Sequence, residues 1–83
     1  MKVSVYSTTT CPYCVMLKKW LKDKDIEFDD IYVDRDRAAA QRMVKLSGQM
    51  GVPFTTIEGE DGKLQGVLGF DVPTISHLLS VSA

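Results

Sequence analysis

The two cysteines of the chain, Cys11 and Cys14, are three positions apart. They lie where a strand-like alternation of side chains ends and a helix-like pattern begins. Residues 2–6 alternate apolar and polar side chains, which is typical of a strand. Residues 12–24 are mostly good helix formers, and Pro12 suits a first helical turn because proline lacks the N–H that would have no partner there. The spacing therefore predicts a strand that passes through a short polar loop into a helix carrying both cysteines near its start.

The apolar face of this first helix is predicted from side chains four residues apart, which share one side of a helix. We expect the core to contain two such pairs, Leu17 with Leu21 and Met16 with Trp20. The opposite face is predicted to lie in solvent and consists of Lys18, Lys19, Lys22 and Asp23.

The rest of the chain predicts five further elements. They are a strand at residues 27–33, a helix that ends near residue 46, hairpin strands at residues 54–57 and 64–68, and a helix over residues 72–80. Asp34 or Asp36 is the expected cap of the second helix, and Asp71 is that of the third. The inner face of the second helix is expected to consist of Ala40, Met43, Val44 and Ser47.

The order of these elements, β-α-β-α-β-β-α, predicts an α/β fold. The first β-α-β unit implies a parallel strand pair with a right-handed crossover. The hairpin adds two antiparallel strands, which gives a mixed four-stranded sheet with three helices on its faces. A chain of 83 residues fits one such domain, residues 1–83, and leaves no room for a second domain that could bind a nucleotide or flavin.

Composition excludes several classes of partner. Lys and Arg number 10 against 11 Asp and Glu, so the net charge of −1 gives no reason to expect nucleic acid or an anionic membrane. The apolar stretches are far shorter than the roughly 20 residues that span a bilayer. Because the N-terminal segment resembles a strand and not a signal peptide, we expect a cytoplasmic protein. Paired thiols in that setting are usually catalytic, redox-sensing or metal-binding.

The positions of the two cysteines predict different chemical roles. Cys11 lies at or before the first helical turn, where backbone N–H groups lack partners and favour an anion. Cys14 lies one turn inside the helix and is expected to be more buried. The implied reaction has two steps: the Cys11 thiolate attacks a substrate disulfide, and Cys14 then attacks Cys11, releases the reduced substrate and closes a Cys11–Cys14 disulfide.

Two other uses of the cysteine pair remain open at this point. One is half of a zinc site, but zinc takes about four ligands and the chain offers Cys11, Cys14 and the distant His77, so a four-cysteine site would need a dimer. The other is a purely structural disulfide, which is uncommon in a cytosolic chain. The redox interpretation is favoured because the pair follows a strand and opens a helix within a β-α-β pattern. We expect no metal.

Along most of its length the chain resembles the glutaredoxin family. Three motifs carry the resemblance: Cys11-Pro12-Tyr13-Cys14, Gly51-Val52-Pro53 and Gly69-Phe70-Asp71. We call them the cysteine, proline and glycine motifs. The first is the active-site sequence typical of dithiol glutaredoxins. The second matches the proline that, in the thioredoxin fold, follows a cis peptide bond beside the cysteines; the residues alone favour a trans proline at the start of an edge strand, so the cis bond is expected only by the resemblance.

The resemblance implies a thioredoxin fold and a thiol–disulfide oxidoreductase that reduces protein disulfides or glutathione mixed disulfides. It implies substrate contacts at Pro12, Tyr13, Val52, Pro53, Gly69, Phe70 and Asp71. Backbone groups of Val52 would pair with an extended peptide. The residues also allow simpler roles: Tyr13 as a packed surface ring, Phe70 as a core residue, and Asp71 as a helix cap.

Departures from the family pattern bear on the electron source. Glutathione-using members usually have Thr where Gly51 stands, a second glycine in place of Phe70, and a basic residue where residues 8–10 are all threonine. Gly69-Phe70 looks more like NrdH redoxins, which are donors to ribonucleotide reductase, although Val67-Leu68 replaces their Trp-Ser. With no bound cofactor, the Cys11–Cys14 disulfide is expected to draw electrons from glutathione or, preferably, a thioredoxin-reductase-like flavoprotein.

A second class of function suggested by the resemblance is a binding module. It would be a dimer that bridges an iron–sulfur cluster through Cys11 and glutathione. Pro12 and the presence of Cys14 weaken this alternative, and we expect a monomer.

Overall fold

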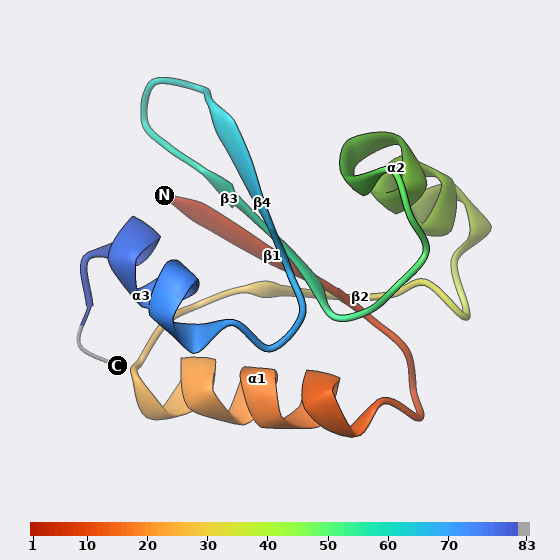
Figure 1. Cartoon of the computed structure of the whole chain (residues 1–83), viewed down its shortest axis with the longest axis horizontal. Helices are drawn as coiled ribbons and strands as arrows, with labels where there is room; N and C mark the ends of the chain where they lie inside the picture. The colour runs from red at the N-terminus through yellow and green to blue at the C-terminus, as the bar shows by residue number, and fades with distance from the viewer. Residues whose placement is uncertain (82–83) are drawn as a thin grey trace.

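The structure, a computed structural model, describes residues 1–81 and follows the predicted order β-α-β-α-β-β-α (Figure 1). Its elements are β1 (Lys2–Ser7), α1 (Pro12–Asp23), β2 (Asp29–Tyr32), α2 (Arg37–Ser47), β3 (Phe54–Glu58), β4 (Leu64–Leu68) and α3 (Val72–Leu79). The sheet has the strand order β2-β1-β3-β4, with β1 parallel to β2 and antiparallel to β3, and with β4 antiparallel to β3. The predicted mixed four-stranded sheet with three helices is thus confirmed.

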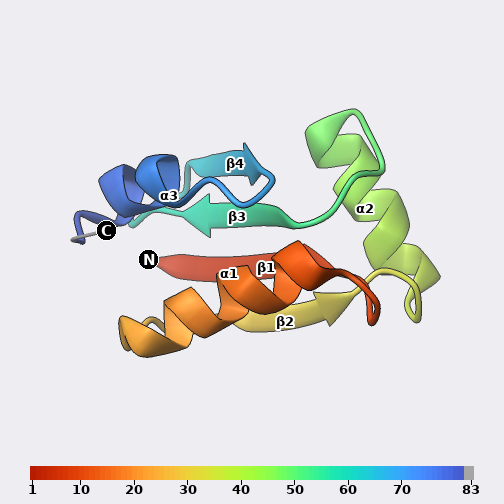
Figure 2. The ribbon, with the colours of Figure 1, turned by 60° about the horizontal axis from the view of Figure 1, so that its bottom comes forward.

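The helices lie on both faces of the sheet, which makes three layers (Figure 2). Side chains alternate along β1, so Val3 and Val5 face α1 and α3 while Tyr6 faces α2. The larger core cluster lies on the first face and the smaller one, around Tyr6 and Met43, on the second. In the part of the chain that the structure describes, no helix is both long and apolar enough to cross a membrane.

The inner face of α1 differs from the one predicted. Leu17 and Leu21 are fully buried together with Cys14, but Met16 is 48% exposed, so its predicted place in the core is wrong. The three buried residues are spaced three and four apart and therefore define one stripe of the helix. Lys18 lies four residues after Cys14 on that stripe, and its side chain is only 11% exposed although we expected it in solvent.

The buried face of α2 also differs from the one predicted, because it begins one residue earlier in the sequence. Ala39 and Met43 are the buried residues, whereas Val44, expected inside, is 38% exposed. Asp36 is the cap, because its carboxylate accepts the Ala39 N–H at 3.1 Å. The helix ends at Ser47, and Gly48 follows it with a φ of 74°, the left-handed conformation that glycine adopts at low cost.

The second strand is shorter than predicted. We expected residues 27–33, but β2 contains Asp29–Tyr32, paired with β1 from Ser4↔Asp29 to Ser7↔Tyr32. Within residues 1–81, β2 pairs with β1 alone, and since β1 ends at Ser7 the register between them ends there as well.

Candidate active site

Cys11 is the residue that caps the first turn of α1. The chain leaves β1 at Ser7, passes through a three-threonine loop, and reaches Cys11 in extended conformation. The Cys11 sulfur accepts the backbone N–H of Cys14 at 3.2 Å, and Pro12 occupies the first helical position. A helix N-terminus carries a partial positive charge, and the Cys11 sulfur lies at this positive end of α1.

Cys14 lies in a different environment, with no exposed surface. Burial raises the pKa of the Cys14 thiol to about 11, and the hydrogen bond to Cys11 and the charge of Cys11 act in the same direction. The Thr8 backbone and the Lys18 ammonium act in the opposite direction. Cys14 is therefore a neutral thiol near pH 7, whereas Cys11 is partly exposed. Both are free thiols, so the structure is that of the reduced protein.

The loop before Cys11 is bonded to the segment that follows β2. The Thr9 N–H and hydroxyl both donate to one Asp34 carboxylate oxygen, at 3.0 and 2.7 Å. These bonds, the hydroxyl first, lower the pKa of Asp34 below its usual value. The sequence suggested Asp34 only as a helix cap; its partner lies 25 residues away, so no local pattern signals this contact.

The proline motif lies beside Cys11. The Val52–Pro53 peptide bond is cis, as the resemblance implies. The Cys11 thiol makes a sulfur hydrogen bond of 3.9 Å to the Val52 carbonyl oxygen. The Pro53 carbonyl accepts the Gly69 N–H at 2.8 Å, and Gly69 has a φ of 79°. Val52, Pro53 and Gly69, which all follow Cys11 by more than 40 positions, are thereby brought to the start of α1.

Two aromatic side chains lie next to each other at the surface of this region. The ring centroids of Tyr13 and Phe70 are 6.5 Å apart, and the two residues are 60% and 37% exposed. We call this pair the aromatic rim. It joins the cysteine motif to the glycine motif, and it leaves large apolar area in solvent of the kind that protein interfaces use.

Asp71 is the cap of α3, as the sequence suggested. Its carboxylate accepts the Thr74 N–H at 3.2 Å and the Thr74 hydroxyl at 2.8 Å. Both oxygens thus have partners within the chain, and a substrate contact at Asp71 stays a prediction. Among residues 1–81, no three His, Cys, Asp or Glu side chains gather into a group that could bind a metal ion.

A parallel β-α-β unit with a dithiol at the start of its helix, beside a cis proline, defines a protein of the thioredoxin fold with a cysteine-pair active site. Comparison with known proteins identifies the group within that class. The glutaredoxin family model matches residues 3–61, so the chain belongs to the glutaredoxin family. Members of this family are generally thiol–disulfide oxidoreductases.

Individual relatives agree with this assignment. The chain is 38% identical over 77 residues to an uncharacterized glutaredoxin-like 8.6 kDa protein in the rubredoxin operon of Clostridium pasteurianum, which covers 93% of this chain and 96% of that protein. It is 34% identical over 58 residues to glutaredoxin 3 of Escherichia coli, with 70% of each chain covered. The structure of the NrdH-redoxin from Escherichia coli superposes with a TM-score of 0.77 at 26% identity, over 94% of this chain and 95% of that one.

Proposed function

We propose that the protein is a dithiol electron carrier that reduces disulfides through Cys11 and Cys14. The observation that carries the proposal is the asymmetry of the pair: Cys11 is partly exposed at the helix cap, whereas Cys14 is buried and its pKa is about 11. The Cys11 thiolate attacks one sulfur of a substrate disulfide, and the other substrate sulfur leaves as a thiolate. Cys14 then attacks Cys11, so the protein is oxidised by two electrons and the substrate is reduced by two.

Protein disulfides are the substrates that the surroundings of Cys11 favour. The aromatic rim, formed by Tyr13 and Phe70, offers exposed apolar area beside the reactive sulfur. Aromatic side chains are enriched where proteins dock. By the resemblance of Gly69-Phe70 to NrdH redoxins, the disulfide of ribonucleotide reductase is one candidate substrate.

We propose a thioredoxin-reductase-like flavoprotein, in preference to glutathione, as the electron source. Glutathione is anionic overall and needs cations or N–H donors for its carboxylates. The loop before Cys11 offers threonines, and Thr9 is bonded to the Asp34 carboxylate, which carries the wrong charge for such a ligand. Phe70 places a ring where a second glycine would allow close backbone approach. Each missing charge-assisted bond is worth roughly 1.5–3 kcal/mol, or about one to two decades of affinity.

The dithiol reaction also bears on the cofactor, the oligomeric state and the compartment that we propose. The Cys11–Cys14 dithiol itself carries the electrons, so no bound cofactor is required, and both cysteines come from one chain, so a monomer suffices. Free thiols in an exchangeable pair fit a reducing compartment such as the cytoplasm. An iron–sulfur cluster bridged through Cys11 would leave Cys14 without a role, and we do not adopt that alternative.

The test is NADPH consumption with a protein disulfide substrate and each reducing system at equal concentration. We expect turnover with thioredoxin reductase, at least tenfold slower turnover with glutathione plus glutathione reductase, and none with Cys11→Ser in either system. Fast turnover with glutathione alone would overturn the choice of reductant. Failure to reduce the substrate with either system, or with a chemical dithiol as electron donor, would overturn the proposed function itself.

A further inference from the structure

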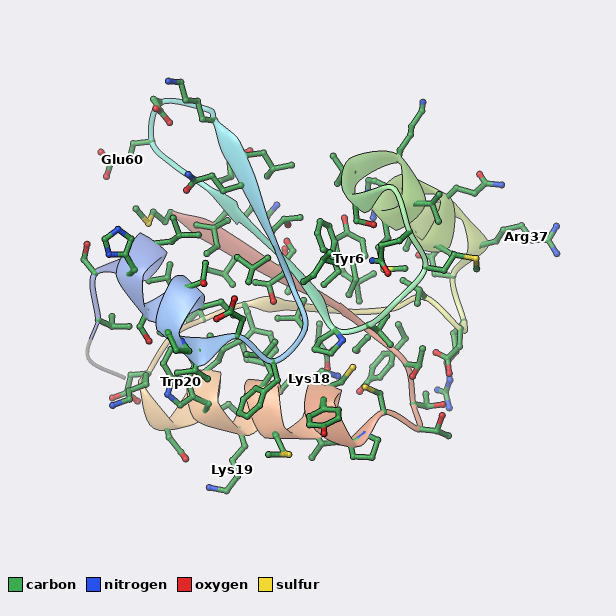
Figure 3. All side chains as sticks on the ribbon, in the orientation of Figure 1. Tyr6, Lys18, Lys19, Trp20, Arg37 and Glu60 are labelled. Atoms are coloured by element: carbon green, nitrogen blue, oxygen red, sulfur yellow. The ribbon has the colours of Figure 1, made fainter. Side chains whose placement is uncertain are left out.

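Lys18 directs a charged side chain toward the sheet and not into solvent. It lies one turn after Cys14 on the buried stripe of α1, and its side chain is 11% exposed. The neighbouring Lys19 has a side chain that is 75% exposed. Figure 3 shows the contrast, with Lys19 extending away from α1 into solvent and Lys18 on the side of the helix that faces the sheet. A lysine so placed needs partners, because burial of an unpaired charge is costly.

Two residues of β2 provide those partners. The Lys18 ammonium lies 2.7 Å from the Asp30 carboxylate and 4.3 Å from the centroid of the Tyr32 ring. Asp30 and Tyr32 are two apart on a strand and therefore point to the same face, which is the face that α1 covers. The Ser7 hydroxyl donates to the same carboxylate at 3.4 Å. The ammonium is thus fixed from α1, β1 and β2 together.

These partners keep Lys18 charged. Burial by itself lowers the pKa of the ammonium, but the bonds to Asp30 and Tyr32 outweigh it, so the pKa of Lys18 is above its usual value. Lys18 is therefore a cation at every pH at which thiol–disulfide exchange is measured.

Cys14 needs such a cation in the second step of the reaction. Its thiol must lose a proton before it can attack, and burial opposes the thiolate. Within residues 1–81, the groups that act on the charge of Cys14 are the Cys11 sulfur, the Thr8 backbone and Lys18. Once Cys11 is bonded to substrate it no longer carries a charge, and Thr8 supplies only a dipole. Of these three groups, Lys18 is then the one that carries a full charge, and the Asp30 carboxylate paired with it offsets part of that charge.

We propose that the Lys18 ammonium, positioned by Asp30 and Tyr32, stabilises the Cys14 thiolate during resolution of the mixed disulfide. In this step the Cys14 thiol gives its proton to solvent, and the thiolate attacks the Cys11 sulfur. The Cys14–Cys11 bond forms, the bond from Cys11 to the substrate sulfur breaks, and that sulfur leaves as a thiolate with the electron pair. The inference rests on the proposed dithiol function and adds a residue outside the three motifs.

A chromogenic aromatic disulfide, dithiobis(nitrobenzoate), separates the two steps. In stopped flow, attack by Cys11 releases one nitrothiobenzoate at a rate that depends on probe concentration. Attack by Cys14 releases a second one at a rate that does not. We expect both phases in the wild-type protein. If the wild-type protein releases a single equivalent, the proposed function is contradicted and the inference is overturned with it. If it releases two, the dithiol function is supported, and the Lys18 variants then test the inference.

For Lys18→Met we expect the second phase to be about three- to tenfold slower at pH 7, with its pH profile displaced upward, because an opposite charge near a thiol shifts its pKa and part of this charge is offset by Asp30. The first phase should change less than twofold. Lys18→Arg keeps the charge and should restore the profile. Lys19→Met removes the same charge from the exposed face of α1 and serves as the matched control.

Two results would overturn the inference. One is a pH profile of the second phase in Lys18→Met that coincides with that of Lys19→Met. The other is equal slowing of both phases, which would assign Lys18 a general structural role. If Lys18→Met does not fold, the double variant Lys18→Met/Asp30→Asn removes the charge pair together and leaves no unpaired carboxylate. An upward displacement is expected there too, smaller than that of Lys18→Met because the offsetting Asp30 charge is removed as well, and an unchanged profile would again refute the proposal.

Discussion

The Cys11 sulfur accepts the backbone N–H of Cys14 at 3.2 Å, so the first cysteine caps the helix that carries the second. One contact thereby satisfies a donor at the helix N-terminus and directs the positive end of α1 onto the sulfur of Cys11. The same geometry places Cys14 one turn inside, where it is fully buried. The division between attacking and resolving thiol thus follows from where the helix begins.

The first prediction is that Cys14→Ser traps the substrate on Cys11. The variant keeps the partly exposed sulfur and removes the buried thiol that would displace the substrate, so a mixed disulfide should accumulate at close to one per protein. Cys11→Ser should form none, because the remaining thiol is buried with a pKa of about 11 in the native site. Intact-protein mass spectrometry after reaction with a disulfide peptide measures both outcomes.

Alkylation provides an independent check of this assignment. At pH 7, iodoacetamide should modify Cys11 of the wild-type protein well before Cys14. Faster labelling of Cys14 would show that the roles are reversed. Cys11→Ser is the appropriate control for folding, since serine is a good N-cap and keeps the start of α1 intact.

A second prediction concerns the contact between Asp34 and the loop before Cys11. Asp34→Ala removes the acceptor of both Thr9 bonds, so the Thr9 amide should exchange with solvent about threefold faster or more, as expected for one exposed charged contact. Asp34→Asn, which keeps a carbonyl acceptor, should lie between the variant and the wild type. An unchanged Thr9 exchange rate in Asp34→Ala would contradict the contact.

The same contact has a defined pH dependence. Because the folded-state pKa of Asp34 is below its usual 3.8, the contact contributes fully above pH 3.8. It is lost as the pH falls through the lower folded-state pKa. In an NMR titration from pH 6 to pH 2, the Thr9 amide resonance should therefore move only at the acid end, with a midpoint below 3.8. A midpoint above that value would show that the carboxylate is not stabilised by Thr9.

Local sequence patterns predicted the elements and their order well. Alternation on β1, apolar spacing on α1, and Asp71 before α3 each depend on residues a few positions apart, and the structure contains all three features. The position of the dithiol at the strand–helix junction was predictable for the same reason. Local patterns did not predict its surroundings, because Val52 and Phe70 reach Cys11 and Tyr13 only through the folded sheet; the resemblance to glutaredoxins is what indicated a proline beside the cysteines.

The wrong predictions of the helix faces share a physical cause. On α1, the pairs Leu17–Leu21 and Met16–Trp20 are both spaced by four, and spacing alone cannot tell which stripe the sheet will cover. The sheet covers the stripe that contains Cys14, which leaves Met16 exposed and turns Lys18 inward. Lys18 can lie on that stripe because its ammonium pairs with the Asp30 carboxylate of β2. This partner is twelve residues away in another element, so helical spacing does not indicate it.

A third prediction separates capping from binding at Asp71. Asp71→Ala removes the bonds to the Thr74 N–H and hydroxyl and should cost about 0.5–2 kcal/mol of unfolding free energy. Asp71→Asn keeps the cap and removes the charge, so it should retain nearly all of that stability. Urea denaturation measures both variants. We also expect Asp71→Asn to reduce disulfides at the wild-type rate; a clear loss of turnover in that stable variant would assign Asp71 to substrate binding.

The last prediction concerns the aromatic rim and the partner that docks on it. Phe70 is 37% exposed and its ring centroid lies 6.5 Å from that of Tyr13, so truncation removes apolar contact area beside Cys11 without removing either thiol. Phe70→Ala should raise the KM for the reducing flavoprotein about five- to thirtyfold, the range expected for an aromatic contact at an interface. The rate of Cys11 alkylation should stay unchanged. Leu46→Ala removes a comparably exposed apolar side chain from α2 and should alter neither quantity. A KM for Phe70→Ala equal to that for Leu46→Ala would exclude the rim from the docking surface, and an increased rate with glutathione in Phe70→Ala would show that the ring also blocks the smaller reductant.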